Sequence, residues 1–445
     1  MKKLLLLFIV LLSWTSFSQV SWTEQFTSYP VSGSYTGDIS IVDANTIWTL
    51  VQPTTTTNHQ TFSKTTNGGA TWTSGSINIG NTTMAIANIS AIDANTAWVA
   101  VYPNATSTPI TAQGIYKTTN GGTTWTKQTT AAFGSTSFVN FVHFWDANNG
   151  VCMGDKQGGY WEVYTTTNGG TNWTRTNALG FSASTGDYGY TGKYYVKGNT
   201  IWFGTDNGEL MKSVNKGLNW TKITTPITDF GGGTDTSSVA EFAFANDLNG
   251  FILKETFSGT TYTGLVLYKT TNGGSVWTTV TPGTGIFHGS IDFAGTGMLV
   301  TGGSTTGNFG SSYSLDNGVT WTNIDALSHT CLKFFSETVG FGGGFATATT
   351  GGAFKFNNTL SNTNFNQNRF VSYPNPAKDF ITVSNNDNVL LTDVTITDLN
   401  GRTVKTLKVE NLNEVEINIS DLNSGVYLMN ITSDEGKSVK KFIKN

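Results

Sequence analysis

Thr118-Thr119-Asn120-Gly121-Gly122-Thr123-Thr124-Trp125 is one of six copies of a short phrase that recurs along this chain of 445 residues. The other copies are Thr65 to Trp72, Thr166 to Trp173, Ser213 to Trp220, Thr270 to Trp277 and Ser314 to Trp321. Their tryptophans are separated by 53, 48, 47, 57 and 44 residues. A nearly constant period of this length indicates one supersecondary unit repeated along the chain.

A second element precedes each phrase and consists of an apolar strand, a short turn with Asp or Asn, and another strand, as in Ile39 to Trp48. There are seven such hairpins for six phrases. Val20 to Gln25 resembles the strand that follows each phrase, so it can complete the unit that lacks one. We therefore predict an all-β fold over residues 19–357: a seven-bladed, or alternatively six-bladed, β-propeller whose N-terminal strand closes the last blade.

The composition agrees with many short strands and excludes some classes of partner. The chain has 51 glycines, 13% aromatic residues and only 12% charged residues, which favours strands joined by tight turns over long helices. The formal net charge of -4 and the absence of a basic stripe argue against nucleic acid as a partner.

The first residues are typical of an export signal. Lys2 and Lys3 precede an apolar run from Leu4 to Leu12, and small residues follow at Ser16 and Ser18. This run is shorter than the roughly 20 apolar residues that cross a bilayer, and no other stretch approaches that length. We expect cleavage of residues 1–18, no transmembrane span in the mature protein, and export from the cytoplasm.

The composition changes after an Asn-rich stretch at 357–367, where charges become denser and the phrase no longer recurs. We expect a linker over 358–369 and a separate domain over 370–445, built as a small antiparallel β-sandwich. Its expected strands are Phe380 to Val383, Val394 to Thr397, Val404 to Val409, Val415 to Ile419, Val426 to Ile431 and Val439 to Ile443.

The recurring phrase resembles the Asp-box of the BNR repeat family, which occurs in sialidases, sortilin-type receptors, xyloglucan-hydrolysing glycosidases and photosystem II assembly factors. The resemblance implies a turn between the third and fourth strands of a blade. There the Asn or Asp side chain can satisfy backbone N–H groups, Gly supplies a positive φ, and Trp covers the turn. The expected structural residues are Thr65, Asn67, Gly69, Trp72, Thr118, Asn120, Gly122, Trp125, Thr166, Asn168, Gly170, Trp173, Ser213, Asn215, Gly217, Trp220, Thr270, Asn272, Gly274, Trp277, Ser314, Asp316, Gly318 and Trp321.

No metal site and no cofactor are predicted. Five of the six boxes carry Asn where hard cations would need an ionised oxygen, so a turn-capping role is favoured. Cys152 and Cys331 fall in distant repeats, which places them too far apart for a disulfide and favours free thiols. The four histidines, His59, His143, His288 and His329, have no ligand spacing.

Catalysis is left open, and no catalytic residue is assigned. Sialidases of this repeat family need three arginines around the substrate carboxylate, and this chain has only Arg175, Arg369 and Arg402, so that activity is disfavoured. A glycoside hydrolase needs only two carboxylates. Candidates on the face opposite the boxes are Asp155, Glu162, Asp187, Asp206, Glu209, Asp229, Asp235 and Glu255, and the alternative interpretation is that they are ordinary solvated loop charges.

The same loops carry aromatic residues that could stack on sugar rings or grip a peptide, or could simply be packed. They are Tyr102, Tyr160, Trp161, Tyr188, Tyr190, Phe230, Tyr262 and Phe309. Because binding residues usually lie on loops of a rigid scaffold, this face is the predicted ligand face. Its candidate residues are Tyr160, Trp161, Asp187, Tyr188, Tyr190 and Glu255.

The end of the chain resembles the type A sorting domain of the Bacteroidetes type IX secretion system. The resemblance rests on the segments Tyr373 to Phe380, Ile396 to Arg402, Ile419 to Leu428 and Lys440 to Lys444, with Tyr373, Pro374, Asn375, Pro376, Gly401, Gly425 and Tyr427 as the motif residues. The resemblance implies the secretion machinery as a partner, passage through the periplasm, and a secreted or outer-membrane surface location. The expected function is an exported binding or scaffold protein for polysaccharide or protein, with an extracellular glycoside hydrolase as the alternative.

Overall fold

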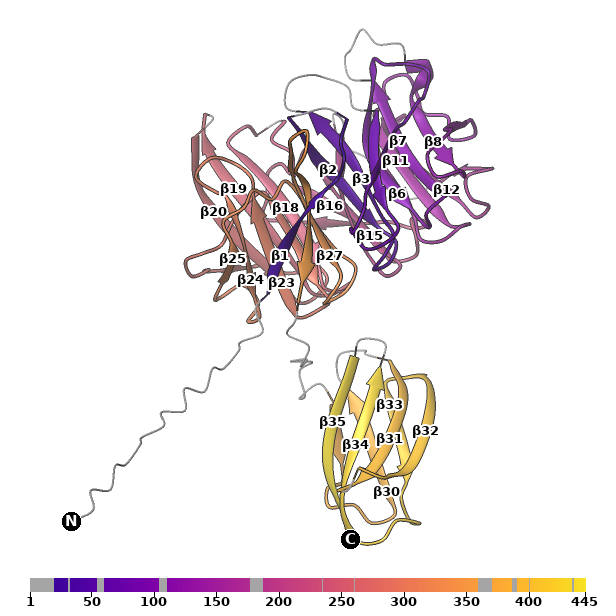
Figure 1. Cartoon of the computed structure of the whole chain (residues 1–445), viewed down its shortest axis with the longest axis vertical. Coiled ribbons are helices and arrows are strands. Elements are labelled where there is room, and N and C mark those ends of the chain that lie inside the picture. Colours follow the sequence, from indigo (N-terminus) through magenta and orange to yellow (C-terminus); the bar gives the residue numbers. More distant parts are fainter. Residues whose placement is uncertain are drawn as a thin grey trace, which may run out of the picture. The chain divides into compact units, whose positions relative to one another are not determined.

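The structure is a computed structural model that describes residues 20–30, 33–53, 60–103, 110–176, 187–233, 235–259, 261–358, 370–385, 390–399, 401–433 and 436–445. The expected signal at 1–18, His59, Arg369 and all but the first residue of the expected linker lie outside these ranges. The chain separates into two compact units that divide between Thr359 and Leu360 (Figure 1). Within the described residues the only helical element is a 3-10 turn, η1 (Ile110–Ala112), so the chain is all-β.

The first unit is built from four-stranded antiparallel groups in which consecutive strands are hydrogen-bonded neighbours. Five groups form separate sheets in the described part of the chain, and the remaining strands form one eight-stranded sheet. The separate sheets are β6 (Met84–Ala91), β7 (Ala97–Pro103), β8 (Gly114–Thr118), β9 (Thr126–Gln128); β10 (Val139–Phe144), β11 (Gly150–Gln157), β12 (Tyr160–Thr166), β13 (Thr174–Arg175); β14 (Gly189–Lys197), β15 (Thr200–Thr205), β16 (Glu209–Ser213), β17 (Thr221–Thr224); β18 (Ser238–Phe244), β19 (Gly250–Ser258), β20 (Thr261–Thr270), β21 (Thr278–Val280); and β22 (Ser290–Ala294), β23 (Met298–Gly303), β24 (Gly310–Ser314), β25 (Thr322–Asp325).

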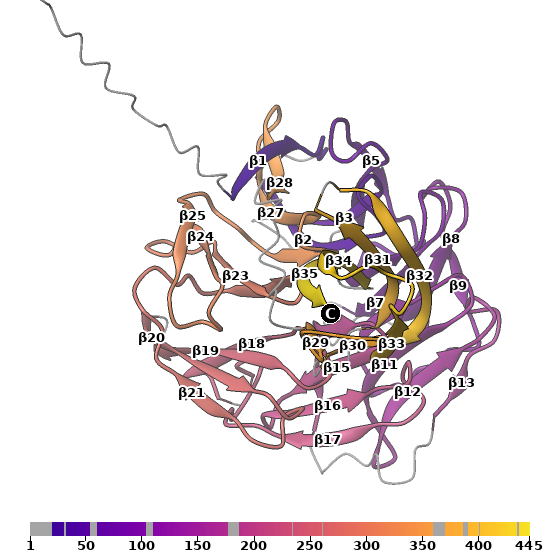
Figure 2. The ribbon, with the colours of Figure 1, turned by 90° about the horizontal axis from the view of Figure 1, so that it is seen from below.

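The eight-stranded sheet joins the two ends of this unit. It contains β2 (Ser34–Ile41), β3 (Ile47–Pro53), β4 (Thr61–Thr65) and β5 (Thr73–Ser76), followed on the other side by β26 (Leu332–Phe334), β27 (Gly340–Ala346), β28 (Gly351–Asn357) and β1 (Ser21–Phe26). β1 pairs antiparallel with β28 from Ser21 opposite Asn357 to Phe26 opposite Gly352. Figure 2 shows the two strands side by side. The expected pairing of the N-terminal strand with the last strand of the unit is therefore present.

The groups close into a ring around their first strands. β2 contacts β6, and the contacts continue through β10, β14, β18, β22 and β26, which returns to β2. Figure 2 shows the groups of the first unit arranged in a circle. Side chains of one first strand accept hydrogen bonds from backbone N–H groups of the next. The pairs are Asp38 with Ile89, Ser40 with Ala91, Asn88 with Val142, Ser90 with Phe144, Ser290 with Leu332 and Asp292 with Phe334.

The hydrophobic core lies between neighbouring sheets. Trp48 and Phe62 of one group pack with Ile89, Tyr116 and Trp125 of the next, all buried. Similar clusters recur around the ring because alternate residues of each strand point to opposite faces of its sheet. Since every sheet is covered on both faces by its neighbours, the aromatic-rich composition is used for packing.

The second unit has two antiparallel sheets around a core of its own that includes Phe370, Ile381, Met429 and Phe442. One sheet has the order β29 (Phe370–Tyr373), β30 (Phe380–Asn385), β33 (Glu414–Asn418). The other has the order β32 (Thr403–Leu412), β31 (Leu391–Asp398), β34 (Gly425–Ser433), β35 (Gly436–Lys444).

Candidate functional site

The six repeated phrases form the same turn between the third and fourth strands of their groups. In each turn the Gly that stands four residues after the Thr or Ser donates its N–H to that hydroxyl group at 2.8–3.0 Å. The Asn or Asp oxygen accepts an N–H from the residue four positions ahead, also at 2.8–3.0 Å. These side chains thus supply hydrogen bonds that the tight turn cannot make with its own backbone.

The tryptophans of the phrases cover the turns but differ in one respect. Trp220 and Trp321 donate their indole N–H to the Gly carbonyl of their own turn, Gly217 and Gly318, at 2.9 Å. The indole N–H of Trp125 is buried without an acceptor in the described part of the chain. The ring of Trp125 packs edge-on against Phe62 of the preceding group, with centroids 6.2 Å apart.

Three of these turns accept a hydrogen bond from a lysine of the preceding group. These contacts were not predicted from the sequence. Lys64, Lys117 and Lys355 donate to the carbonyls of Gly121, Gly169 and Gly68, at 2.8–2.9 Å. Lys64 and Lys117 also lie 4.6 and 4.7 Å from the ring centroids of Trp48 and Trp98. The available signal was a Lys directly before the Thr or Ser of four boxes, at Lys64, Lys117, Lys212 and Lys269.

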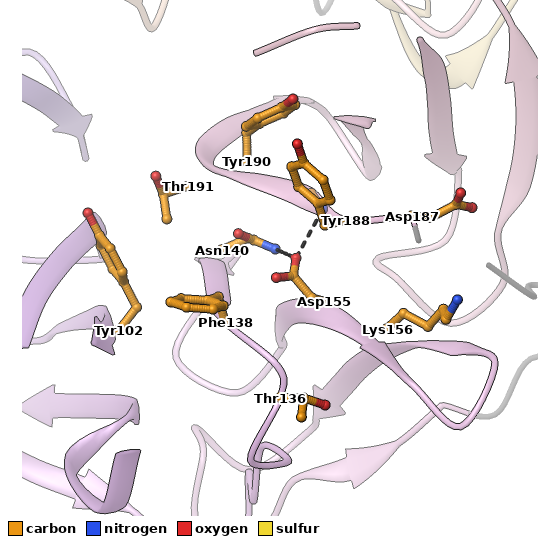
Figure 3. Close-up of a pocket in the computed structure, with 11 residues that line it drawn as sticks. Tyr102, Thr136, Phe138, Asn140, Asp155, Lys156, Asp187, Tyr188, Tyr190 and Thr191 are labelled. Carbon is orange, nitrogen blue, oxygen red and sulfur yellow. Dashed lines mark hydrogen bonds between the residues drawn. The ribbon is translucent and has the colours of Figure 1, made fainter. Parts of the chain in front are cut away.

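The opposite face of the ring carries a cavity of about 490 Å³ (Figure 3). Strand ends and loops of three successive groups form it, because loops between second and third strands and loops between groups emerge on the side away from the boxes. Its lining residues are Tyr102, Thr136, Phe138, Asn140, Asp155, Lys156, Asp187, Tyr188, Gly189, Tyr190 and Thr191. Three of the six predicted ligand-face residues, Asp187, Tyr188 and Tyr190, line it.

Asp155 is held in a fixed orientation in this cavity. Its Oδ1 accepts hydrogen bonds from the amide of Asn140 at 2.7 Å and from the backbone N–H of Gly189 at 3.0 Å. Burial raises the pKa of Asp155 to about 6, and the charge of the nearby Asp206 adds to the rise. The hydrogen bonds from Asn140, Gly189 and the backbone of Phe138 oppose the rise. The carboxyl group therefore titrates close to physiological pH.

The tyrosines of the cavity are positioned by further carboxylates. The Tyr190 hydroxyl donates to Asp229 Oδ1 at 2.6 Å, and the rings of Tyr188 and Tyr190 meet at 72° with centroids 5.4 Å apart. Asp206 accepts the backbone N–H of Tyr188 at 2.9 Å, and burial raises its pKa. Asp187 accepts a hydrogen bond from Asn207 at 3.0 Å.

The other three predicted ligand-face residues lie elsewhere. Trp161 is fully buried beside Phe203 in the core and cannot contact a ligand, so its assignment to the ligand face is wrong. Tyr160, its neighbour, is 43% exposed but does not line the cavity. Glu255 is buried and bonded to His288 Nδ1 at 2.7 Å, and Tyr262 stacks on that imidazole.

Several carboxylates interpreted as solvated loop charges are in fact buried. Glu162, Asp229 and Glu255 expose 2%, 0% and 6% of their surfaces. Glu162 accepts the backbone N–H of Gly134 at 2.9 Å and lies 3.9 Å from the guanidinium of Arg175. A buried charge is tolerated when it has such partners. Because the partners lie in other segments of the chain, the burial of these carboxylates could not be predicted from the sequence pattern alone.

A second cluster of charges lies on the first strands of the ring. Lys333 lies 5.9 Å from the ring centroids of both Tyr194 and Tyr195, and Tyr195 donates to Asp292 at 2.7 Å. Burial raises the pKa of Asp38 to about 6, and the charge of Lys333 opposes the rise. Cys152 and Cys331 are both free thiols, and the residues that the structure describes contain no group of three His, Cys, Asp or Glu side chains able to hold a metal ion.

The motif residues of the second unit gather near the ends of its strands. Asn375 donates to the carbonyl of Lys441 at 3.2 Å and accepts the N–H of Ile443 at 3.0 Å. Gly401 has a φ of 79°, and Tyr427 packs on Phe442 and donates to the carbonyl of Asn423 at 2.8 Å. Tyr373 and Gly425 lie at the end of β29 and the start of β34, and Pro374 and Pro376 follow cis peptide bonds.

The comparisons with known proteins separate the two units in the same way. Residues 371–445 match the secretion system C-terminal sorting domain family. No curated protein sequence is significantly similar to the chain. No helix within the described ranges is long and apolar enough to cross a membrane.

The first unit is similar in fold to solved β-propellers. A structure of YCF48 bound to D1 peptide has a TM-score of 0.52 and 13% identity and covers 77% of this chain and 98% of its own. YCF48 from Cyanidioschyzon merolae has a TM-score of 0.51 and 19% identity and covers 76% and 99%. The GH74 xyloglucanase from Xanthomonas campestris has a TM-score of 0.48 and 10% identity and covers 82% and 59%.

At these identities the likeness shows the fold alone. The family match, by contrast, spans the whole of the second unit after Phe370 and includes every one of its predicted motif residues. The chain thus joins a unit with a β-propeller fold to a domain that matches the secretion system C-terminal sorting domain family.

Proposed function

We propose that this protein is an exported, non-catalytic binding protein whose seven-bladed propeller captures a polysaccharide or a protein in the cavity around Asp155. In this proposal residues 1–18 are a signal peptide, the chain crosses the periplasm, and residues 358–369 link the propeller to a sorting sandwich at 370–445. The Asp-box residues are scaffolding, because their oxygens and N–H groups are used within the turns.

The observation that carries the binding proposal is the cavity on the face opposite the Asp-boxes. It combines four aromatic side chains with polar groups and lies on loops of a rigid ring, which is the usual setting of a binding site. Its volume of about 490 Å³ falls within the roughly 300–1,000 Å³ of small-ligand sites.

The binding proposal is tested by retention. The mature full-length protein is passed over immobilised glycans and over a set of extracellular proteins, beside the variant Tyr188→Ala. We expect retention on at least one of them and its loss in the variant. Retention that survives Tyr188→Ala and Asp155→Asn without change would place the binding site elsewhere and refute the proposal.

The export proposal is tested by deletion of residues 370–445. Because the two units have separate cores, the truncated propeller should stay folded but remain in the cell, while the full chain reaches the surface or the medium. The measurement is the protein in cell and medium fractions, together with a melting curve of the truncated chain. Normal amounts of truncated protein outside the cell would contradict the assignment.

A glycoside hydrolase remains the second candidate, since Asp155 and Asp187 line one cavity and the pKa of Asp155 is raised to about 6, as in a general acid. Incubation with the retained glycan would then release reducing ends. Their release by the natural protein and its loss in Asp187→Asn would favour hydrolysis over simple binding. Binding without any new reducing ends would favour the first proposal.

A further inference from the structure

The lining of the cavity limits the chemistry of its ligand, and the inference that follows rests on the proposed binding function. Four aromatic side chains, Tyr102, Phe138, Tyr188 and Tyr190, give it apolar surface (Figure 3). Between them lie hydroxyl, amide, carboxylate and ammonium groups, including Thr136, Asn140, Thr191 and Lys156. The cavity therefore offers flat apolar walls together with both hydrogen-bond donors and acceptors.

Asp155 offers one directed acceptor. Its hydrogen bonds from Asn140 and Gly189 both end on Oδ1. The backbone N–H of Phe138 is a third hydrogen-bond partner of this carboxylate, and in Figure 3 the second oxygen, Oδ2, lies on the side of Phe138. Because an ionised carboxylate has about four acceptor positions, Oδ2 can accept a further donor from a ligand. A ligand that reaches this oxygen must bring a donor of its own, because the carboxylate has lost part of its hydration.

The charges of the lining disfavour an ionic ligand of either sign. Two carboxylates, Asp155 and Asp187, oppose an anion, and no arginine lines the described cavity. Lys156 in the same wall opposes a cationic side chain, and Asp187 is already engaged by Asn207. An uncharged ligand with several hydroxyl groups can instead donate to a carboxylate and accept from an amide or ammonium group at once.

We propose that the cavity binds a neutral sugar residue of a glycan, with a sugar hydroxyl donating to Asp155 Oδ2 and the C–H face of the sugar packing on the tyrosine rings. Asp155 is then the specificity-determining acceptor. The rings of Tyr188 and Tyr190 provide the apolar contact.

The variant Asp155→Asn tests this acceptor directly. Since two N–H donors already meet at the position of Oδ1, the Asn carbonyl must occupy that position and its NH₂ group the place of Oδ2. The substitution therefore keeps the hydrogen bonds from Asn140 and Gly189 but turns an acceptor toward the ligand into a donor. We expect at least a tenfold loss of glycan affinity, while a melting curve still shows cooperative unfolding of the variant.

The experiment is calorimetric titration of the mature full-length protein with neutral oligosaccharides of glucose, mannose, xylose and galactose, with oligogalacturonate, and with a lysine-rich peptide. Tyr188→Ala should also lose binding, whereas Tyr160→Ala, which removes an exposed aromatic outside the cavity, should not.

In the natural protein we expect affinity to fall as the pH drops from 7 to 5, and Asp155→Asn to abolish that dependence. The groups around the titrating Asp155 carboxyl are Asn140, Gly189, Asp206, Lys156 and Asp187.

The outcomes separate the inference from the function on which it rests. Suppose that oligogalacturonate or the lysine-rich peptide binds tightly, that this binding is lost in Tyr188→Ala, and that no neutral glycan binds. This result would overturn the sugar assignment, whereas the cavity would still be the binding site. Failure of every neutral glycan to bind would likewise overturn it. Glycan affinity that is unchanged in both Asp155→Asn and Tyr188→Ala would overturn the inference and the proposed site together.

Discussion

At the scale of single residues, each Asp-box turn has one position that demands glycine and one that does not. The second of these two positions is Gly in every box and has a φ between 83° and 93°. At Gly122 an added Cβ would lie 2.2 Å from Phe62. The first position has a φ of 57° at Lys216 and 63° at Asn317, within the small left-handed region that other residues can adopt. This explains why the phrase varies only at the first of the two positions.

The indole N–H groups of the boxes lead to a paired prediction. Trp220→Phe removes a hydrogen bond of 2.9 Å to Gly217, whereas Trp125→Phe removes an N–H that has no acceptor in the described chain. Both changes delete the same atoms from equally buried sites. We expect Trp220→Phe to cost about 1 kcal/mol more unfolding free energy, measured by urea denaturation. Equal losses would mean that the hydrogen bond contributes nothing.

The residues of the cavity show what strand patterns could and could not predict. Asp187, Tyr188 and Tyr190 were predicted because they lie on a loop of the correct face. Trp161 was wrong because successive residues of a strand point in opposite directions, so only one of Tyr160 and Trp161 can face outward. Phe138 and Asn140 were missed because they lie at the beginning of a first strand, where the sequence indicates only core.

At the scale of elements, strand pairing was easier to predict than the contacts between sheets. Six of the seven strands that the structure describes in the second unit were predicted; the missed one, β29, is short and ends at Tyr373, just before a proline. The lysine contacts were missed because a Lys before a Thr on a strand suggests a solvated charge. Its acceptor, the next turn of the ring, is visible only once neighbouring sheets are placed.

The lysine contacts predict a specific stabilisation between neighbouring sheets. Lys117→Ala removes a charge-assisted hydrogen bond to Gly169 and the contact with the Trp98 ring, and should cost about 1–2 kcal/mol of unfolding free energy. Lys269 occupies the same position before its box but makes no hydrogen bond to the described part of the next turn, so Lys269→Ala is the matched control. A similar loss in both variants would point to a general effect of removing lysine.

At the scale of the whole molecule, the first strands bring ionisable groups together around the ring, and these groups make stability depend on pH. The folded-state pKa of Asp38 is about 6, above its ordinary value of 3.8, so the folded state binds the proton more tightly. Its contribution to stability is complete below about pH 4 and is lost as the pH rises through 6. His143 acts in the opposite direction, because burial lowers its pKa to about 3.

The opposing effects are separated by the variant Asp38→Asn, which can keep the hydrogen bond from Ile89. Relative to the natural protein, this variant should gain stability as the pH rises from 4 to 6, because it no longer carries a charge that folding disfavours. The measurement is the difference in unfolding free energy between the two proteins at each pH. A difference that stays constant or shrinks would contradict the raised pKa.

The ring is closed by β1, and Trp22 is its principal anchor. Its ring lies 5.1, 5.9 and 4.9 Å from those of His329, Phe334 and Phe356, and its N–H donates to Ser311 of the neighbouring sheet at 2.9 Å. The partner of β1 in the sheet, β28, lies at the other end of the first unit in sequence, so no short loop connects the two strands and Trp22 helps to hold them together. Removing the Trp22 side chain should therefore destabilise the pairing of β1 with β28 before the rest of the ring.

Trp22→Ala should cost about 2 kcal/mol or more and should raise hydrogen exchange in β1 and in β26–β28 while β10–β13 stays protected. Loss of β1 exposes the edge of β28, which explains why the effect should concentrate there. Phe26→Ala, at the exposed end of the same strand, is the control and should change exchange little. If exchange instead rises equally in all sheets of the Trp22 variant, the ring opens as one cooperative unit, and β1 does not close it as a separable element.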